Sequence, residues 1–208
     1  LGNYSRSTLR LLSQYHPENN YFMFTAKVNY EIFQPSANLQ LVTPENRLYQ
    51  SASGLWRSWG INRQIQDHKI NIYHGLSNEL PAGIQKTGVK TVVTIHDLIF
   101  LRYPEYYPYI DRKVYLLKFS YACKVADKII AASEATKADI CHYFGIDPAK
   151  IEVVYQTCNP VFRKQVPTIE KEQVIKKYDL PQRFILYLGT IERRKNALTL
   201  VKAYLKRN

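Results

Sequence analysis

Seven short apolar runs, separated by stretches with helical periodicity, limit the fold of this chain more than any other feature of its sequence. The runs are rich in Val and Ile, as strands buried in a parallel sheet are. Because strands that alternate with helices form βαβ units, the pattern predicts an α/β fold with a doubly wound parallel sheet. The expected strands cover residues 21–26, 39–42, 70–74, 89–95, 128–132, 151–155 and 184–188.

The clearest expected helix follows the run at 89–95. Apolar residues recur there in steps of three and four, and such a stripe is typical of a helix that packs on a core. The stripe consists of Tyr107, Ile110, Val114, Leu117, Tyr121 and Val125.

The chain is expected to contain two domains. Residues 159–167 have a proline near each end and no strong period, which suits a linker. We therefore assign residues 1–162 to a first domain that starts with a helix at 3–13 and lacks its first strand. Residues 163–208 are the linker and the start of a second α/β domain, which we expect to be incomplete because roughly forty residues cannot close a core.

Composition excludes several classes of protein. The 208 residues are 46% apolar, which suits a globular chain. We find neither a run of roughly 18 apolar residues for a membrane span nor the apolar core of a signal peptide. The three cysteines, Cys123, Cys141 and Cys158, form no C-x-x-C pattern, so we expect neither a disulfide framework nor a zinc site. These features predict a cytoplasmic protein.

The charge of the chain is strongly positive and uneven. The net charge is +12, and residues 160–208 hold twelve Lys or Arg against four Asp or Glu. This excess points to an anionic partner such as phosphate, nucleic acid or a membrane surface. A solvated basic face explains any single cluster equally well.

Polar residues follow four of the expected strands. In doubly wound sheets ligands bind beyond the carboxyl ends of the strands, so these residues are expected to meet at one crevice. They are the pairs His74-Gly75, His96-Asp97, Ser133-Glu134 and Gly189-Thr190.

His96 is the main candidate for chemistry among them. Its imidazole titrates near neutral pH and could act as a general acid or base or donate a hydrogen bond to a ligand. Asp97 either orients this ring or caps the following turn. A purely structural role for His96 stays open.

The neighbouring strand ends have weaker claims. Gly75, beside His74, either lets a backbone approach a ligand or makes the turn. A metal shared by His74 and His96 has no tight ligand spacing to support it, and we expect none. Ser133 is expected to cap the helix that begins SEATKADI, and a ligand contact there is compatible with capping.

The loop LGTIERRKN, at residues 188–196, combines a strand end with three cations before a helix. Such a loop could cradle a diphosphate. It lacks the spacing of a P-loop and of the G-x-G-x-x-G dinucleotide motif. A merely basic approach to the helix remains the alternative.

Several stretches together resemble the family 4 (group 1) retaining glycosyltransferases. They are HGLSNELP, TIHDLIF with RYPEYY, ADKIIAASEATKADICHYFGIDPAKIEVVY and YLGTIERRKN, in the family's order over nearly the whole chain. The resemblance implies the GT-B fold, in which an acceptor-binding and a donor-binding Rossmann-like domain face each other. On this resemblance the chain holds the acceptor domain and only the start of the donor domain. It lacks the donor domain's paired glutamates, so we expect it to be inactive alone.

The resemblance also implies roles for individual residues. His96 resembles the family's cleft histidine, which contacts the transferred sugar and supports catalysis. Gly2 resembles the end of a loop that approaches the donor phosphates. Gly189, Arg194 and Lys195 resemble the part of the donor domain that binds the diphosphate. Apart from the resemblance, the remaining candidates at the strand ends, His74, Gly75, Asp97 and Ser133, are expected to contact the acceptor or to line the cleft.

The implied reaction is transfer of a hexose, such as mannose, from a nucleotide-sugar to a saccharide or lipid-linked acceptor with retention, without a bound metal or other cofactor. An anionic membrane surface is a further expected partner, which would place the protein at the inner membrane face in polysaccharide or lipopolysaccharide synthesis. Two alternatives stay open. One is a non-catalytic Rossmann-like binding module, and the other is a basic nucleic-acid-binding protein, although no nucleic-acid-binding motif is recognisable.

Overall fold

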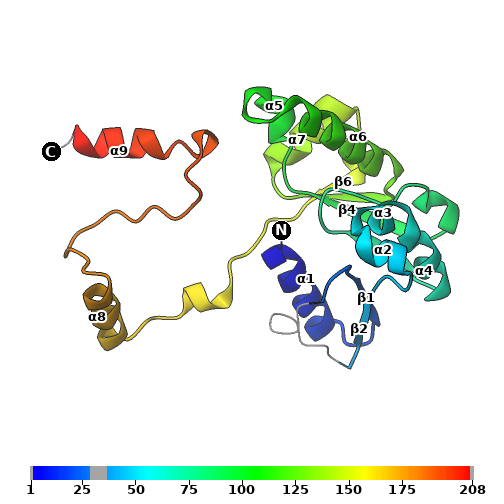
Figure 1. The fold of residues 1–208 in the computed structure, drawn as a ribbon, viewed down its shortest axis with the longest axis horizontal. Helices are drawn as coiled ribbons and strands as arrows, with labels where there is room; N and C mark the ends of the chain where they lie inside the picture. Colours follow the sequence, from blue (N-terminus) through cyan, green and yellow to red (C-terminus); the bar gives the residue numbers. More distant parts are fainter. Residues whose placement is uncertain (1, 29–36, 207–208) are drawn as a thin grey trace. The chain divides into compact units, whose positions relative to one another are not determined.

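The computed structural model describes residues 2–28 and 37–206, which fall into two units. The first unit is Leu1–Thr157 and the second is Cys158–Asn208. The division lies five residues before the expected boundary at residue 162. Figure 1 shows the chain coloured from its N-terminus to its C-terminus, and each unit is considered by itself.

Six of the seven expected strands form, all in the first unit and all paired in parallel. They make a two-stranded sheet of β1 and β2 and a four-stranded sheet in the order β3-β4-β5-β6. The α/β fold class with parallel sheets is therefore confirmed, although the described strands form two sheets and not one. The strands are β1 (Tyr21–Phe24), β2 (Leu39–Val42), β3 (Ile72–Gly75), β4 (Lys90–Ile95), β5 (Lys128–Ala131) and β6 (Ile151–Val153).

Helices connect the strands of the first unit. α6 contacts β4, and α7 contacts β5 and β6; Figure 1 shows α5, α6 and α7 together on one side of β4 and β6. The helical elements of this unit are α1 (Gly2–Tyr15), α2 (Arg47–Ser51), α3 (Ser53–Leu55), η1 (Trp56–Gly60), α4 (Ile61–Asp67), η2 (Ile84–Thr87), α5 (Ile99–Arg102), η3 (Pro104–Tyr106), α6 (Tyr109–Val125), α7 (Glu134–Phe144) and η4 (Pro148–Lys150).

The core of the first unit lies around β4 and β5. Their side chains are buried together with residues of η1, α4, α6 and α7. Five of the six residues of β4 are buried or half-buried, as in a strand covered on both faces. Polar residues at the end of such a strand are therefore exceptions that need a specific role. The largest fully buried side chains include Trp56, Ile65, Ile95, Ile129 and Ile140.

The helix expected after residue 107 forms as α6, but the predicted apolar stripe does not pack on the core as a whole. Ile110 is 73% exposed and Leu117 is 72% exposed. The core instead receives Ala122 and Cys123, with Phe119 packed against it. Because α6 carries apolar residues at helical spacing on two faces, the period alone could not show which face is buried.

The second unit differs more from expectation. Its helices are η5 (Pro160–Arg163), α8 (Thr168–Lys177), η6 (Arg193–Lys195) and α9 (Ala197–Leu205). The strand predicted at residues 184–188 does not form, and Leu188 in that run is 91% exposed. A strand needs a neighbour for its backbone N–H and C=O groups, and the described residues of this unit include no strand that could pair with it. The expectation of a strand there was wrong.

Asp127 ties the start of β5 to the start of β4. Its carboxylate accepts hydrogen bonds from the backbone N–H of Thr91 at 2.8 Å and from the Thr91 hydroxyl at 2.9 Å, and Lys90 lies 3.3 Å away. These bonds favour the ionised form, so the backbone and side chain of Thr91, with Lys90, lower the pKa of Asp127 below the usual value for an aspartate.

Replacing Asp127 with Asn tests this link between the two strands. A group with a lowered pKa stabilises the fold above its unfolded pKa and loses that contribution as the pH falls through the folded pKa. We therefore expect Asp127→Asn to reduce the free energy of unfolding most above about pH 4 and progressively less below it. Urea denaturation of both proteins across acidic pH measures the difference, and a difference independent of pH would contradict the assignment.

Candidate active site

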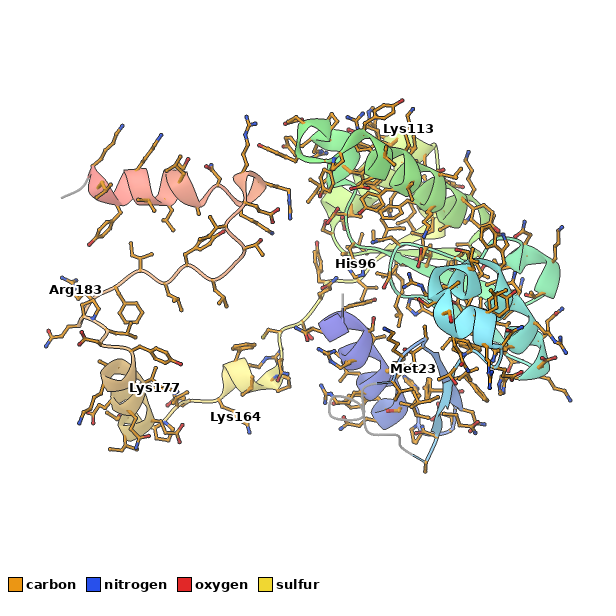
Figure 2. The ribbon with its side chains drawn as sticks, in the orientation of Figure 1. Met23, His96, Lys113, Lys164, Lys177 and Arg183 are labelled. Carbon is orange, nitrogen blue, oxygen red and sulfur yellow. The ribbon has the colours of Figure 1, made fainter. Side chains whose placement is uncertain are left out.

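The candidate site lies at the carboxyl ends of β3 and β4. Because these strands are neighbours in register, with Gly75 opposite Val93, their ends come to the same edge of the sheet. His74 is the third residue of β3, and His96 directly follows β4. The two strand ends that the sequence analysis expected to converge therefore do so. Figure 2 labels His96 close to the first turns of α1.

Both nitrogens of the His96 ring have hydrogen-bond partners. Nε2 lies 2.9 Å from the carbonyl oxygen of Leu76, and Nδ1 lies 2.7 Å from Nε2 of Gln156. The His96 backbone is also fixed, because its N–H donates to Oδ1 of Asn78 at 2.7 Å and its carbonyl accepts from the Thr136 hydroxyl at 3.1 Å. The half-buried ring is thus held in one orientation at the sheet edge.

A second group of contacts links His96 to α1 and to His74. The rings of Tyr4 and His96 are in edge-to-face contact, with their centres 4.9 Å apart. The Tyr4 hydroxyl lies 3.0 Å from Oγ1 of Thr94, and His74 Nε2 lies 2.8 Å from the same oxygen. Thr94 therefore joins the helix that Gly2 begins to both histidine-bearing strands.

His74 differs from His96 in its surroundings. Burial lowers the pKa of His74 to about 4, because an apolar environment disfavours the charged ring. The ring is therefore neutral at physiological pH. It can donate or accept one hydrogen bond to Thr94, but it supplies no positive charge to a ligand.

Asp97, Gly75 and Ser133 each have a structural role in the first unit, and their contact with an acceptor or with the cleft stays a prediction. Asp97 Oδ1 accepts from the backbone N–H of Ile99 at 3.3 Å, so Asp97 caps the turn before α5. No hydrogen bond among the described residues joins Asp97 to the His96 ring. Of the two roles considered for Asp97, the structure shows the capping of the turn. At Gly75 a Cβ atom would collide with the carbonyl oxygen of Glu79, so this glycine makes the turn after β3.

Ser133 caps α7, as expected. Its Oγ accepts from the backbone N–H of Thr136 at 3.1 Å and lies 3.0 Å from the Thr136 hydroxyl. Since the same Thr136 hydroxyl bonds the His96 carbonyl, the N-terminus of α7 supports the candidate site. A direct ligand contact by Ser133 stays a prediction.

The predicted diphosphate residues Gly189, Arg194 and Lys195 belong to the second unit. Arg194 and Lys195 lie in η6, and Asn196, at a left-handed φ of 53°, turns the chain into α9. Arg194 pairs with Glu192 at 2.9 Å, and Lys195 is exposed. Their binding of a diphosphate, like that of Gly2, stays a prediction.

Metal-ligand clusters and membrane-spanning helices are both absent from the part of the chain that the structure describes. Residues 2–28 and 37–206 contain no group of three or more His, Cys, Asp or Glu side chains that could hold a metal ion. Within the same residues, we find no helix with the length and apolar character to cross a membrane.

Six partners of the two histidines were not predicted as site residues: Tyr4, Leu76, Asn78, Thr94, Thr136 and Gln156. Tyr4 and Thr94 lie within two residues of Gly2 and His96, but nothing in their own pattern signals a contact. Asn78 and Gln156 come from a turn and from the segment after β6, and reach His96 only through the fold. Residues 74–81 of the motif HGLSNELP did contain Asn78, and its left-handed φ of 63° marks the tight turn.

The fold and site define an α/β domain with parallel sheets and two histidines at the carboxyl edge. Comparison with known proteins identifies its family: residues 21–160 match the sequence pattern described as Glycosyltransferase Family 4. The chain belongs to this family of glycosyltransferases, which confirms the resemblance and with it the GT-B, Rossmann-like fold.

Two kinds of relatives from Escherichia coli are similar in sequence. The chain is 32% identical over 142 residues to the O-antigen chain mannosyltransferase B, covering 67% of this chain and 36% of that protein. It is 33% identical over 141 residues to the serotype-specific mannosyltransferase WbdA, covering 65% of this chain and 17% of that protein. The chain thus spans about a third or less of the length of these relatives.

A solved structure agrees with the fold. The glycosyltransferase from Rickettsia africae ESF-5 superposes with a TM-score of 0.60 at 18% sequence identity. The match covers 92% of this chain and 50% of that one. At this identity it supports the fold alone.

Proposed function

We propose that the protein transfers a hexose from a nucleotide-sugar donor to a saccharide or lipid-linked acceptor, with retention of configuration, in the synthesis of a surface polysaccharide or lipopolysaccharide. Membership of glycosyltransferase family 4 supports the reaction class. The names of the two E. coli mannosyltransferases support mannose as the hexose and a polysaccharide as the product.

The observation that carries this proposal is the fixed position of His96. Its ring stands at the carboxyl edge of a parallel sheet, where ligands of α/β proteins bind, and it lies within the residues that match the family. Its partners Leu76, Gln156 and Tyr4 hold the ring in place before any substrate arrives. Such preorganisation is what a group that supports a transition state requires.

The proposed chemistry breaks the bond between the sugar C1 and a diphosphate oxygen and forms a bond from C1 to the acceptor oxygen on the same face. The acceptor hydroxyl proton passes to the departing diphosphate, which gains negative charge. Arg194 and Lys195 would stabilise that charge as fixed cations, with Gly2 and Gly189 allowing close approach to the phosphates. No metal ion is assigned a role in this scheme.

We further place the protein at the cytoplasmic face of an anionic membrane. The net charge of +12 supports attraction to anionic lipid. The exposed face of α6 supports contact with the interface, since it presents Ile110, Val114 and Leu117 with Lys113 among them. Figure 2 shows Lys113 on the outer side of this helix.

The test is a donor panel with the protein at its full natural length. UDP-, GDP- and ADP-hexoses are each supplied with an oligosaccharide acceptor, and release of the nucleoside diphosphate is followed. We expect release and sugar transfer with one nucleotide class, and a product whose new linkage keeps the donor's anomeric configuration. Binding without release, for every donor, would favour a non-catalytic module, and inversion would contradict the proposed mechanism.

A further inference from the structure

The hydrogen-bond partners of the His96 ring determine which ring nitrogen donates and which accepts. The carbonyl oxygen of Leu76 can only accept, so Nε2 of His96, at 2.9 Å, must carry the ring proton. In the neutral ring Nδ1 is then unprotonated, and its lone pair can accept a hydrogen bond. The side-chain amide of Gln156, whose nitrogen lies 2.7 Å from Nδ1, donates to it.

We infer that Gln156 is a positioning residue of the transfer site: its amide holds the His96 imidazole neutral, with the proton on Nε2. This inference rests on the proposed function, because it assigns Gln156 to the same reaction. Gln156 lies three residues beyond β6 and is the last residue but one of the first unit. It therefore fixes the ring from a segment that neither β3 nor β4 supplies.

A neutral ring suits the reaction for an electrostatic reason. In glycosyl transfer, positive charge develops at the sugar C1 as the leaving group departs, as in the oxocarbenium-like state of glycoside hydrolysis. An imidazolium a few ångströms away would oppose that charge, because like charges repel each other. An amide donor at Nδ1 disfavours a second proton on the ring, since the two N–H groups would face each other.

Among the residues around His96, Gln156 is the one that determines the protonation of the ring. The phenol ring of Tyr4 packs edge to face on the His96 ring, with the ring centres 4.9 Å apart. Asp97, the nearest carboxylate in sequence, is turned to the backbone of Ile99. The character of the group at position 156 should therefore control the protonation of Nδ1.

The test replaces Gln156 with Glu and observes the ring directly. The substitution Gln156→Glu would present a carboxylate to Nδ1, so that both ring nitrogens face acceptors and the doubly protonated form is favoured. The full-length protein is labelled with 15N-histidine, and the His96 signals are assigned from a His96→Ala sample. At neutral pH we expect Nε2 alone to be protonated in the wild type and both nitrogens in a large fraction of Gln156→Glu.

Gln66→Glu is the matched control, because Gln66 is also exposed and the charge change is the same. It should leave the His96 signals as in the wild type. Identical His96 spectra for the wild type and Gln156→Glu would overturn the inference. So would a wild-type ring that carries its proton on Nδ1.

Activity provides the second arm. If Gln156 acts only through His96 in the transition state, Gln156→Glu lowers kcat about tenfold with little change in the KM for the donor. An unchanged kcat with a changed ring state would overturn the positioning role. If no donor supports transfer in the wild type, the proposed function fails, and the nitrogen signals still decide whether Gln156 sets the state of the ring.

Discussion

His96→Ala is expected to lower kcat for sugar transfer by at least about 100-fold, a loss of the size that a misplacement of about 1 Å in a preorganised site can cause. The ring stands at the end of β4, where the buried strand gives way to the edge of the sheet. The substitution removes an imidazole ring that contacts Leu76, Gln156 and Tyr4 and is thereby held at the edge of the sheet. The measurement is release of the nucleoside diphosphate with the preferred donor.

Two controls separate this effect from damage to the fold. His142→Ala removes an exposed histidine of α7, whose ring contacts Tyr143, and should leave kcat unchanged. The urea midpoint of His96→Ala shows whether the site variant remains folded. A folded His96→Ala protein that loses less than about tenfold in kcat would reduce His96 to a structural residue.

Trp56→Ala is expected to cost about 3–5 kcal/mol of unfolding free energy, the range for removing a large aromatic side chain from a core. Trp56 is 1% exposed and belongs to the hydrophobic core of the first unit. Its Nε1–H also donates to Oε1 of Gln64 at 2.7 Å, so the substitution leaves a buried amide oxygen without this donor. Such a loss approaches the whole stability of many domains.

The chain provides a matched control in its second tryptophan. Trp59 lies in the same element, η1, but is 58% exposed. We expect Trp59→Ala to change the unfolding free energy by no more than about 0.5 kcal/mol. Equal midpoints for the two variants in chemical denaturation would contradict the core described for the first unit.

The strands of the first unit could be predicted because each is a short apolar run that pairs with a neighbour of the same kind. The same reasoning failed at residues 184–188, where the run is equally apolar. Apolar character predicts a strand only where a neighbouring strand can accept its hydrogen bonds. The local sequence pattern does not show whether such a strand lies next to it in the fold.

The packing of α6 shows a second limit. Ile110 and Leu117 have the spacing of a core stripe, and so do Phe119 and Cys123, together with Tyr115, on the face that packs. A period of 3.6 residues identifies a helix but not which of two apolar faces is buried. The contacts of α6 with β4, α5 and α7 select the face.

Only part of the candidate site could be predicted from the sequence. His74 and His96 could be found because they interrupt or follow buried strands, and parallel strands bring their carboxyl ends to one edge. Gln156 lies 60 positions from His96 in the sequence, and glutamine at a strand exit has no distinctive pattern. Contacts across such a separation arise from the fold and cannot be read from local sequence.

The role of His96 is tested most directly by a crystal structure of the full-length protein with its preferred nucleotide-sugar bound. We expect the transferred sugar to lie at the carboxyl ends of β3 and β4, with a ring atom of His96 within about 3.5 Å, the reach of direct contact. A sugar bound at any other surface of the protein, with the His96 ring still directed only to Leu76 and Gln156, would contradict it.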